Sequence, residues 1–433
     1  MEQKSLPKDR KKSMILRCTP DAKACAVSTI SDLMDRSAQI FMRFSLCLAV
    51  TSFPTTLQEE STISSGSIIC PTECICLSPT QVLCNTGGLV EIPTLQLPTT
   101  LEDLSLTKND FPVIKTDAFA GLRGLRKLSL DGNNISSIKP FAFRGLNKMR
   151  ELSIQHTPLG FIGQFSFAAL QNVTLLVLAY NKIKYVEGYS FAGTSNVKLI
   201  LLSNNPLHSI QSNAFSGLTN VDHLILPSGI RIIEPDSFNG LQHVGLLKLT
   251  FMDLTSLLPY TFRGLSFVHV INIQESDLGA IRKDAFSGLS HINNLNILNN
   301  KIDVIEQLYL TSDRAINILR FHGNHILEAP RAGDTILQVN TISAINNHFP
   351  CDCQIHNILE SDFASNSSTE FQQHNYCISP IEYNGKSMSF VDSDIIARCH
   401  EKVVQDNLGS GAVSSLSIVP FQITMLITFA KFL

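Results

Sequence analysis

A repeat of 24 residues constrains the fold of this chain more than any other feature. The frame L-x-x-L-x-L-x-x-N-x-I recurs in eleven units, and every step between units is 24 residues except two of 23. A row of phenylalanines keeps the same spacing. Regular recurrence of this kind predicts a solenoid, in which one small unit is stacked many times. The units start at Leu101, Leu125, Met149, Val173, Val197, Val221, Val244, Val268, Ile292, Ile316 and Val339, and the phenylalanines are Phe119, Phe143, Phe167, Phe191, Phe215, Phe238, Phe262 and Phe286.

Each unit has a simple physical interpretation. The L-x-L alternation predicts a short strand with one buried side. The asparagine that follows falls in a turn, where its amide can bond to backbone groups that would otherwise be unpaired. The phenylalanine lies on the return leg and fills the interior. Because no unit can bury its own apolar side, stacking should give one continuous core and a parallel sheet on the inside of a curve.

The asparagine position is not uniform. It holds Asn in seven units and a different residue in four, three of which are consecutive. Thr and Ser can still form hydrogen bonds there, whereas the side chains of Gly229 and Met252 cannot. We therefore expect units six to eight to be the least regular. The position holds Asn109, Asn133, Thr157, Asn181, Asn205, Gly229, Met252, Ser276, Asn300, Asn324 and Asn347.

Eight of the eleven cysteines form one set before the repeats and one after them, with none between residues 84 and 351, and Cys18, Cys25 and Cys47 lie upstream of both sets. Two even-numbered sets at the ends of a cysteine-free body indicate disulfide caps. Metal binding is the alternative, since C-x-C occurs in each set, but the paired C-x2-C spacing of a zinc site is missing. The sets are Cys70, Cys74, Cys76 and Cys84, and Cys351, Cys353, Cys377 and Cys399.

These residues resemble the extracellular leucine-rich repeat proteins of the typical 24-residue class. CPTECIC at residues 70–76 is similar to the N-terminal cysteine-rich flank of that family, and NHFPCDC at 347–353 to its C-terminal flank. The resemblance implies an α/β solenoid, a leucine-rich repeat horseshoe with a concave parallel β-sheet and disulfide caps at both ends. It also implies the pairs Cys70–Cys76, Cys74–Cys84, Cys351–Cys377 and Cys353–Cys399.

The N-terminal region has the form of an export signal. Residues 44–53, FSLCLAVTSF, are a short apolar run after Arg43, too short to span a membrane and with Ser52 suited to cleavage. Met42 would begin a conventional leader, so residues 1–41 are either an upstream extension or a long basic segment.

The predicted organisation is a leader at 1–52, an N-terminal flank at 70–100, eleven repeats at 101–347, a C-terminal flank at 348–400, a linker at 401–415 and an apolar tail at 416–433.

The apolar tail follows a short stretch of small residues that includes Asn407. This arrangement is typical of a GPI-attachment signal, with Asn407 as the candidate attachment residue. A single membrane span is the first alternative, and a frayed apolar terminus with no anchoring role is the second. With both flanks, the tail gives the chain an architecture similar to GPI-linked receptors of the Nogo-receptor or connectin kind.

The net charge and the motifs of the sequence argue against nucleic-acid binding and catalysis. The net charge of -3 provides no cationic surface for nucleic acid. No phosphate-binding loop, nucleophile elbow or HExxH motif is present in the sequence, and no cofactor, metal or catalytic residue is predicted. Sequons at Asn134, Asn172 and Asn366 are candidate glycosylation sites in an exported chain.

The x positions of x-L-x-L-x should lie on the outward face of the sheet, and they change from charged to apolar along the chain. An exposed apolar patch of this size usually marks an interaction site. We therefore expect a protein ligand or co-receptor to bind there, in a cell-surface adhesion or receptor ectodomain. A secreted matrix protein with a structural role is the alternative. The predicted ligand-binding residues are Leu175, Val177, Leu199, Leu201, His223 and Ile225.

Overall fold

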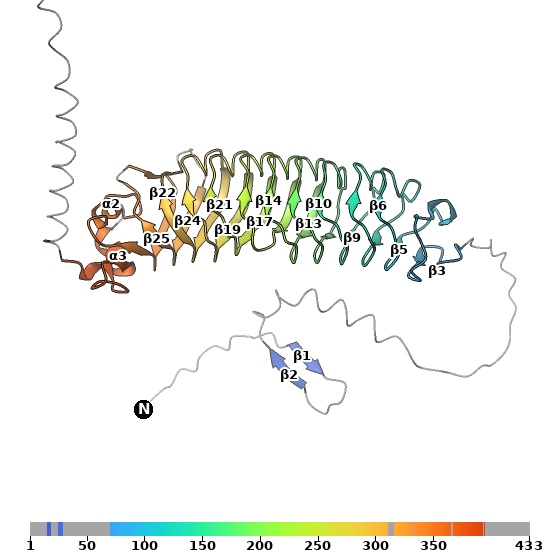
Figure 1. Ribbon diagram of the computed structural model, residues 1–433, viewed down its shortest axis with the longest axis horizontal. Coiled ribbons are helices and arrows are strands. Elements are labelled where there is room, and N and C mark those ends of the chain that lie inside the picture. The colour runs from blue at the N-terminus through green and yellow to red at the C-terminus, as the bar shows by residue number, and fades with distance from the viewer. Residues whose placement is uncertain are drawn as a thin grey trace, which may run out of the picture. The chain divides into compact units, whose positions relative to one another are not determined.

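The computed structural model describes residues 15–18, 25–28, 70–310, 316–331, 333–364, 367–392 and 394. The chain divides into two compact units, Met1–Ser65 and Gly66–Leu433. In the first unit, β1 (Ile15–Cys18) pairs antiparallel with β2 (Cys25–Ser28). The second unit is a stack of coils, which Figure 1 shows side by side in one long row.

A 13-stranded sheet, called the main sheet below, runs along one side of the stack. Each repeat contributes one strand, and the strands are parallel because successive coils follow the same path. Equivalent residues are paired across the whole sheet, as in Leu176 with Ile200 and Ile200 with Leu224. The chain is thus a parallel-strand solenoid, and the predicted units align with its strands. The strands are β3 (Ile75–Ser78), which is antiparallel to β4, then β4 (Gln81–Leu83), β5 (Asp103–Ser105), β7 (Lys127–Ser129), β9 (Glu151–Ser153), β11 (Leu175–Val177), β13 (Ser195–Leu201), β15 (Thr219–Ile225), β17 (Gln242–Thr250), β19 (Ser266–Gln274), β21 (Ser290–Leu298), β24 (Ile316–His322) and β27 (Thr341–Ile345).

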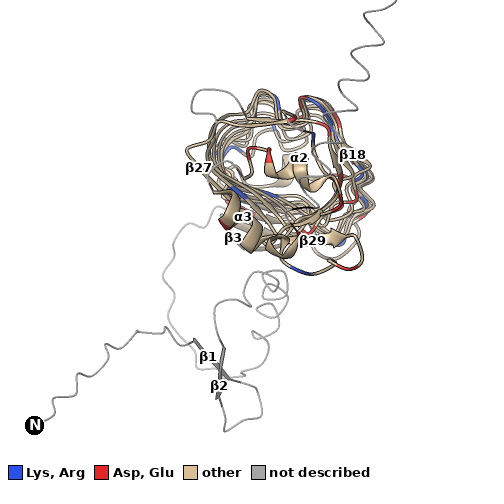
Figure 2. Ribbon diagram, turned by 90° about the vertical axis from the view of Figure 1, so that its left-hand side faces the viewer, with Lys and Arg blue, Asp and Glu red and all other residues tan. Residues whose placement is uncertain are grey.

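The other side of each coil also holds a short strand, and Figure 2 places β27 and β18 on opposite sides of the coils. The return legs of the described repeats contain turns and strands, so the α/β class rests on α2 and α3 in the C-terminal flank. The lateral strands are β6 (Val113–Ile114), β8 (Ser137–Ile138), β10 (Phe161–Ile162), β12 (Tyr185–Val186), β14 (Ser209–Ile210), β16 (Ile232–Ile233), β18 (Ser256–Leu257), β20 (Ala280–Ile281), β22 (Lys301–Ile305), β23 (Leu308–Leu310), β25 (His325–Glu328), β26 (Thr335–Leu337), β28 (His348–Pro350) and β29 (Tyr376–Ser379).

Pairing on both sides controls the shape of the stack. Parallel strands are about 4.8 Å apart wherever they pair, so paired lateral strands have the same spacing as the main sheet. A stack curves when one side of its coils is wider than the other. Because both sides are paired over most of the length, the row of coils bends little in Figure 1.

The core is the continuous column predicted from the repeat. The inward leucines of the main sheet are buried, and so are the eight phenylalanines of the return legs. Their rings stack on one another from coil to coil, with centroids 5.2–5.8 Å apart from Phe119 to Phe286. Each coil therefore buries its phenylalanine only because a neighbouring coil covers it.

The asparagine row forms a hydrogen-bonded ladder. Asn109 N–H donates to Asn133 Oδ1 at 3.0 Å, and Asn300 N–H donates to Asn324 Oδ1 at 3.0 Å. The N–H of Gly229 donates to the backbone carbonyl of Phe251 instead, because Met252, the next residue of the row, has no side-chain acceptor of this kind. The expected irregularity of units six to eight is confined to the asparagine row. The main sheet is regular there, since units seven and eight hold two of its longest strands, β17 and β19.

Disulfides hold the segments at both ends of the repeats. Cys70–Cys76, Cys74–Cys84 and Cys351–Cys377 are bonded, as the family resemblance implies. Cys353 is also disulfide-bonded, whereas Cys399 lies outside the described residues.

Short helices accompany the disulfides in these terminal segments. Ile355 and Ile358 of α2 are buried, and Figure 2 shows this helix across the C-terminal end of the coils. The helices are η2 (Thr94–Gln96), α2 (Ile355–Leu359), α3 (Ser368–His374) and η3 (Met388–Phe390).

Candidate ligand-binding surface

The predicted binding residues lie together on the outward face of the main sheet. Leu175 of β11 is in register with Leu199 of β13, and Val177 is in register with Leu201. Leu201 continues to Ile225 of β15. Side chains at equivalent positions of adjacent strands are in contact, so these residues form one surface, here called the apolar patch.

The apolar patch is half-buried. Leu175, Val177, Leu199, Leu201 and Ile225 have intermediate exposure, because each is flanked by its neighbours along the row and is open on the outward side. The core residues that alternate with them, Leu176, Ile200 and Leu224, are fully buried.

The apolar patch continues along the row past His223, beyond the residues predicted from sequence. His223 is exposed and in register with Leu246, and Leu246 is in register with Val270. Both are half-buried and apolar. Extending the outward positions by one more repeat would have found Val270 from sequence.

Charged residues border the patch on both sides along the stack. On the N-terminal side, Glu151 pairs with Lys127 at 3.1 Å, and Asp131 accepts hydrogen bonds from Ser153 Oγ and the N–H of Gln155. On the C-terminal side, Lys248 follows Ile225 in the same row. The arrangement has an apolar centre with a polar border, as protein interfaces do.

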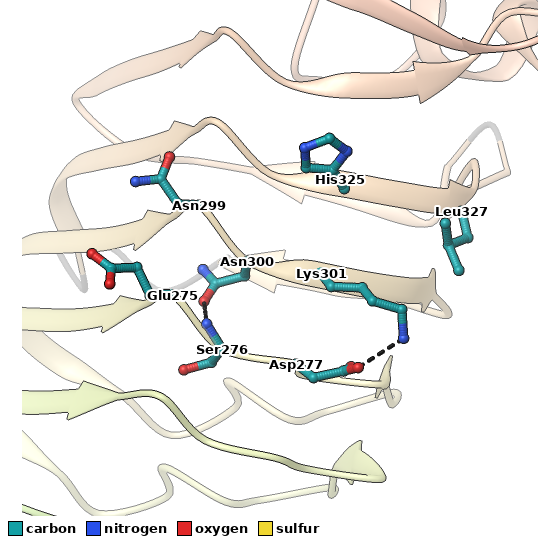
Figure 3. Close-up of a pocket in the computed structure, with 8 residues that line it drawn as sticks. All are labelled: Glu275, Ser276, Asp277, Asn299, Asn300, Lys301, His325 and Leu327. Carbon is teal, nitrogen blue, oxygen red and sulfur yellow. Dashed lines mark hydrogen bonds and ion pairs between the residues drawn. The ribbon is translucent and has the colours of Figure 1, made fainter. Parts of the chain in front are cut away.

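A shallow pocket lies beside β22 and β25 (Figure 3). Two of its charged residues are engaged with each other, since Lys301 Nζ is 2.7 Å from Asp277 Oδ2 and the pair raises the pKa of the lysine. Ser276 N–H donates to Asn300 Oδ1 at 3.1 Å, which is a rung of the asparagine ladder. These contacts give the lining residues structural roles. The lining consists of Glu275, Ser276, Asp277, Asn299, Asn300, Lys301, His325 and Leu327.

Histidines gather at the C-terminal end of the stack. His348 stacks between His325 and Tyr376, with ring centroids 4.2 and 5.3 Å away. Burial and the neighbouring His325 lower the pKa of His348, and burial together with Arg320 lowers the pKa of His322. Across the described residues, no three His, Cys, Asp or Glu side chains are grouped so that they could hold a metal ion.

Two of the three candidate glycosylation sites can be placed. Asn134 and Asn172 are exposed. Asn172 Oδ1 accepts a hydrogen bond from Asn196, which leaves its Nδ2 as the nitrogen open to a glycan. Asn366 lies outside the described residues.

Comparison with known families supports the repeat assignment. Residues 112–245 and 184–317 match the model of the BspA type Leucine rich repeat region, in six copies. The fold is a leucine-rich-repeat-like solenoid. No curated protein matches the chain.

Three solved structures are similar to this solenoid. A chain from the octameric complex of Latrophilin 3, Unc5D and FLRT2 is 18% identical, with 76% of this chain and 99% of that chain covered and a TM-score of 0.43. Human 5T4, or trophoblast glycoprotein, is 18% identical over 77% and 99%, with a TM-score of 0.35. A chain of the mouse RP105/MD-1 complex is 19% identical over 72% and 54%, with a TM-score of 0.41.

Proposed function

We propose that this protein is an extracellular binding protein whose main sheet takes a protein ligand, and that it acts at the cell surface as an adhesion or receptor ectodomain. The observation that carries the proposal is the apolar patch. Leu175, Leu199 and Leu201 occupy outward positions that a solvated sheet would fill with polar residues. Half-buried apolar side chains with a charged border are the composition of an interface centre.

An extracellular location is supported by the disulfides. Disulfides persist in oxidising compartments and are rare in the cytosol. Three disulfides with both cysteines among the described residues lie near the two ends of the repeats. A cleaved leader at 1–52, glycans at Asn134, Asn172 and Asn366, and a GPI anchor at Asn407 complete the proposal.

The leader, Asn407 and residues 416–433 fall almost entirely outside the described residues. Within the described part of the chain, no helix has the length and apolar composition needed to cross a bilayer. Release of the full-length protein from intact cells by a GPI-cleaving phospholipase tests the anchor. Free protein in the medium without treatment would favour the alternative, a secreted matrix protein.

Two outward substitutions test the ligand surface. Leu199→Asp and Leu201→Asp should each weaken binding of the labelled full-length protein to cell surfaces at least tenfold. A central apolar anchor contributes about 2 kcal/mol or more to binding, and about 1.4 kcal/mol is a factor of ten. Both variants should reach the same level of expression as wild type, because both residues face away from the core.

Leu202→Asp is the matched control, since Leu202 adjoins the same strand and is 1% exposed. It should abolish folding and export. Normal cell-surface binding by both outward variants would show that the patch is not the ligand surface.

A further inference from the structure

We propose that the occupant of the main sheet is a second copy of this chain, packed face to face with the two stacks running in opposite directions. The inference rests on the proposed function, because it assigns the partner of the same surface. It is carried by the distribution of charge on either side of the apolar patch and by two half-buried cations that have no acidic partner among the described residues.

The three rows of outward positions carry opposite charge at their two ends. Before the patch they hold three carboxylates and one lysine, a net charge of -2. After the patch, from β17 to β27, they hold two cations and no carboxylate, a net charge of +2. The register of the strands places these groups on the same face. The charged residues are Asp103, Lys127, Asp131 and Glu151 before the patch, and Lys248 and Arg320 after it.

Lys248 and Arg320 are half-buried, yet no described carboxylate lies within ion-pair distance of either. Arg320 Nη1 donates to Asn296 Oδ1 at 3.2 Å, and Asn296 Nδ2 donates to Asn272 Oδ1 at 2.6 Å. Neutral amides therefore supply the contacts of the arginine. A partly buried charge is costly unless a counter-charge accompanies it. A partner with carboxylates over this end of the sheet would provide one.

A twofold axis makes this face complementary to itself. If the axis runs along the strands and coincides with β13, the centre of the patch, each apolar patch meets the other patch. The strand of Glu151, β9, then faces the strand of Lys248, β17, in the second copy. Arg320 on β24 faces β4, one strand away from Asp103 on β5, and the same contacts are made twice. Such an isologous arrangement is the usual geometry of a homodimer. Stacks running in the same direction would instead bring like charges together.

The face is large enough and flat enough for this contact. Eleven strands spaced about 4.8 Å apart and three rows spanning about 14 Å along each strand give a footprint of roughly 700 Å² per copy. A standard protein interface buries about 800 Å² per partner. The row of coils bends little in Figure 1, so two such faces can stay in contact over most of their length.

A charge-swap experiment tests the pairing. Two full-length chains with different tags are co-expressed, one is captured, and the co-captured amount of the other is measured. The variant K248E/R320E has two acidic ends, and the variant D103K/E151K has two basic ends. When two differently tagged copies of the same variant are co-expressed, the co-captured amount should be at least tenfold lower than for the wild type. Co-expression of one variant with the other should restore it, because both ends of the dimer are then complementary again.

The control is K182E/K184E, which changes two exposed lysines just before the lateral strand β12 and alters the net charge by the same amount. It should leave co-capture unchanged. Absence of wild-type co-capture, or co-capture that neither swap reduces, overturns the inference. If wild-type chains do not associate while L199D still weakens cell-surface binding, the ligand is a different protein and the proposed function stands. If L199D weakens neither the co-capture of tagged chains nor the binding of the labelled protein to cell surfaces, both proposals fail.

Discussion

At the scale of single residues, Asn324 is the clearest example of a polar side chain that the fold requires. It is fully buried, and its Oδ1 accepts hydrogen bonds from the backbone N–H and the Nδ2 of Asn300. Its Nδ2 donates to the carbonyl of Ile297 at 2.9 Å and to Asn347 Oδ1 at 3.1 Å. Asn324→Ala would leave several of these groups unpaired inside the stack.

We expect Asn324→Ala to lower the free energy of unfolding by more than about 2 kcal/mol, since each buried group left unpaired costs about 1–3 kcal/mol. Urea unfolding followed by circular dichroism measures the change. The comparison is Asn317→Ala, because Asn317 is an exposed amide of the neighbouring strand β24 and surface changes usually stay within about 0.5 kcal/mol. Equal losses in the two variants would contradict a special role for the buried ladder.

At the scale of the structural element, the stacked phenylalanines hold one coil to the next. Phe215 is fully buried and stacks on Phe191 and Phe238, with centroids 5.8 and 5.6 Å away. Phe215→Ala should cost about 3–5 kcal/mol, as large-to-small core changes do. The control is Phe251→Ala, since Phe251 is 56% exposed. Thermal unfolding should show a much lower Tm for the first variant only, and a Tm close to wild type for both would refute the prediction.

The asparagine row and the phenylalanine row could both be predicted from sequence, because the repeat fixes which positions face inward. The alternation in L-x-L and the constant spacing of Phe215 and its equivalents identify buried positions without any three-dimensional information. The lateral strands could not be predicted in this way. Pairs such as Tyr185 and Val186 of β12 are too short for a periodic pattern, and their pairing depends on how closely the coils stack.

The candidate surface was only partly accessible to sequence reasoning. Leu175 and Leu199 stand out because apolar residues occupy positions expected to be polar. Only distances between neighbouring coils reveal that no described carboxylate pairs with Arg320, and that His348 contacts His325 and Tyr376. Such contacts join residues of neighbouring coils, and a pattern within one coil does not contain them.

At the scale of the whole molecule, the C-terminal end of the stack should make stability depend on pH. His348 is held between His325 and Tyr376, and its Nδ1 is buried without a hydrogen-bond partner among the described residues. Burial and then the charge of His325 lower the pKa of His348. Burial and then Arg320 lower the pKa of His322, against a hydrogen bond with Ser343 that raises it.

A histidine in the unfolded chain titrates near 6.5, so below about pH 6.5 the unfolded chain binds protons that the folded chain does not. Stability should therefore be nearly constant above about pH 7.5 and fall as the pH drops from about 7 toward 5. His348→Gln and His322→Gln should each make that fall less steep, because each removes a group that takes up a proton on unfolding. Urea midpoints measured at intervals between pH 5 and pH 8 test this, and the same slope in wild type and both variants would show that neither histidine contributes to it.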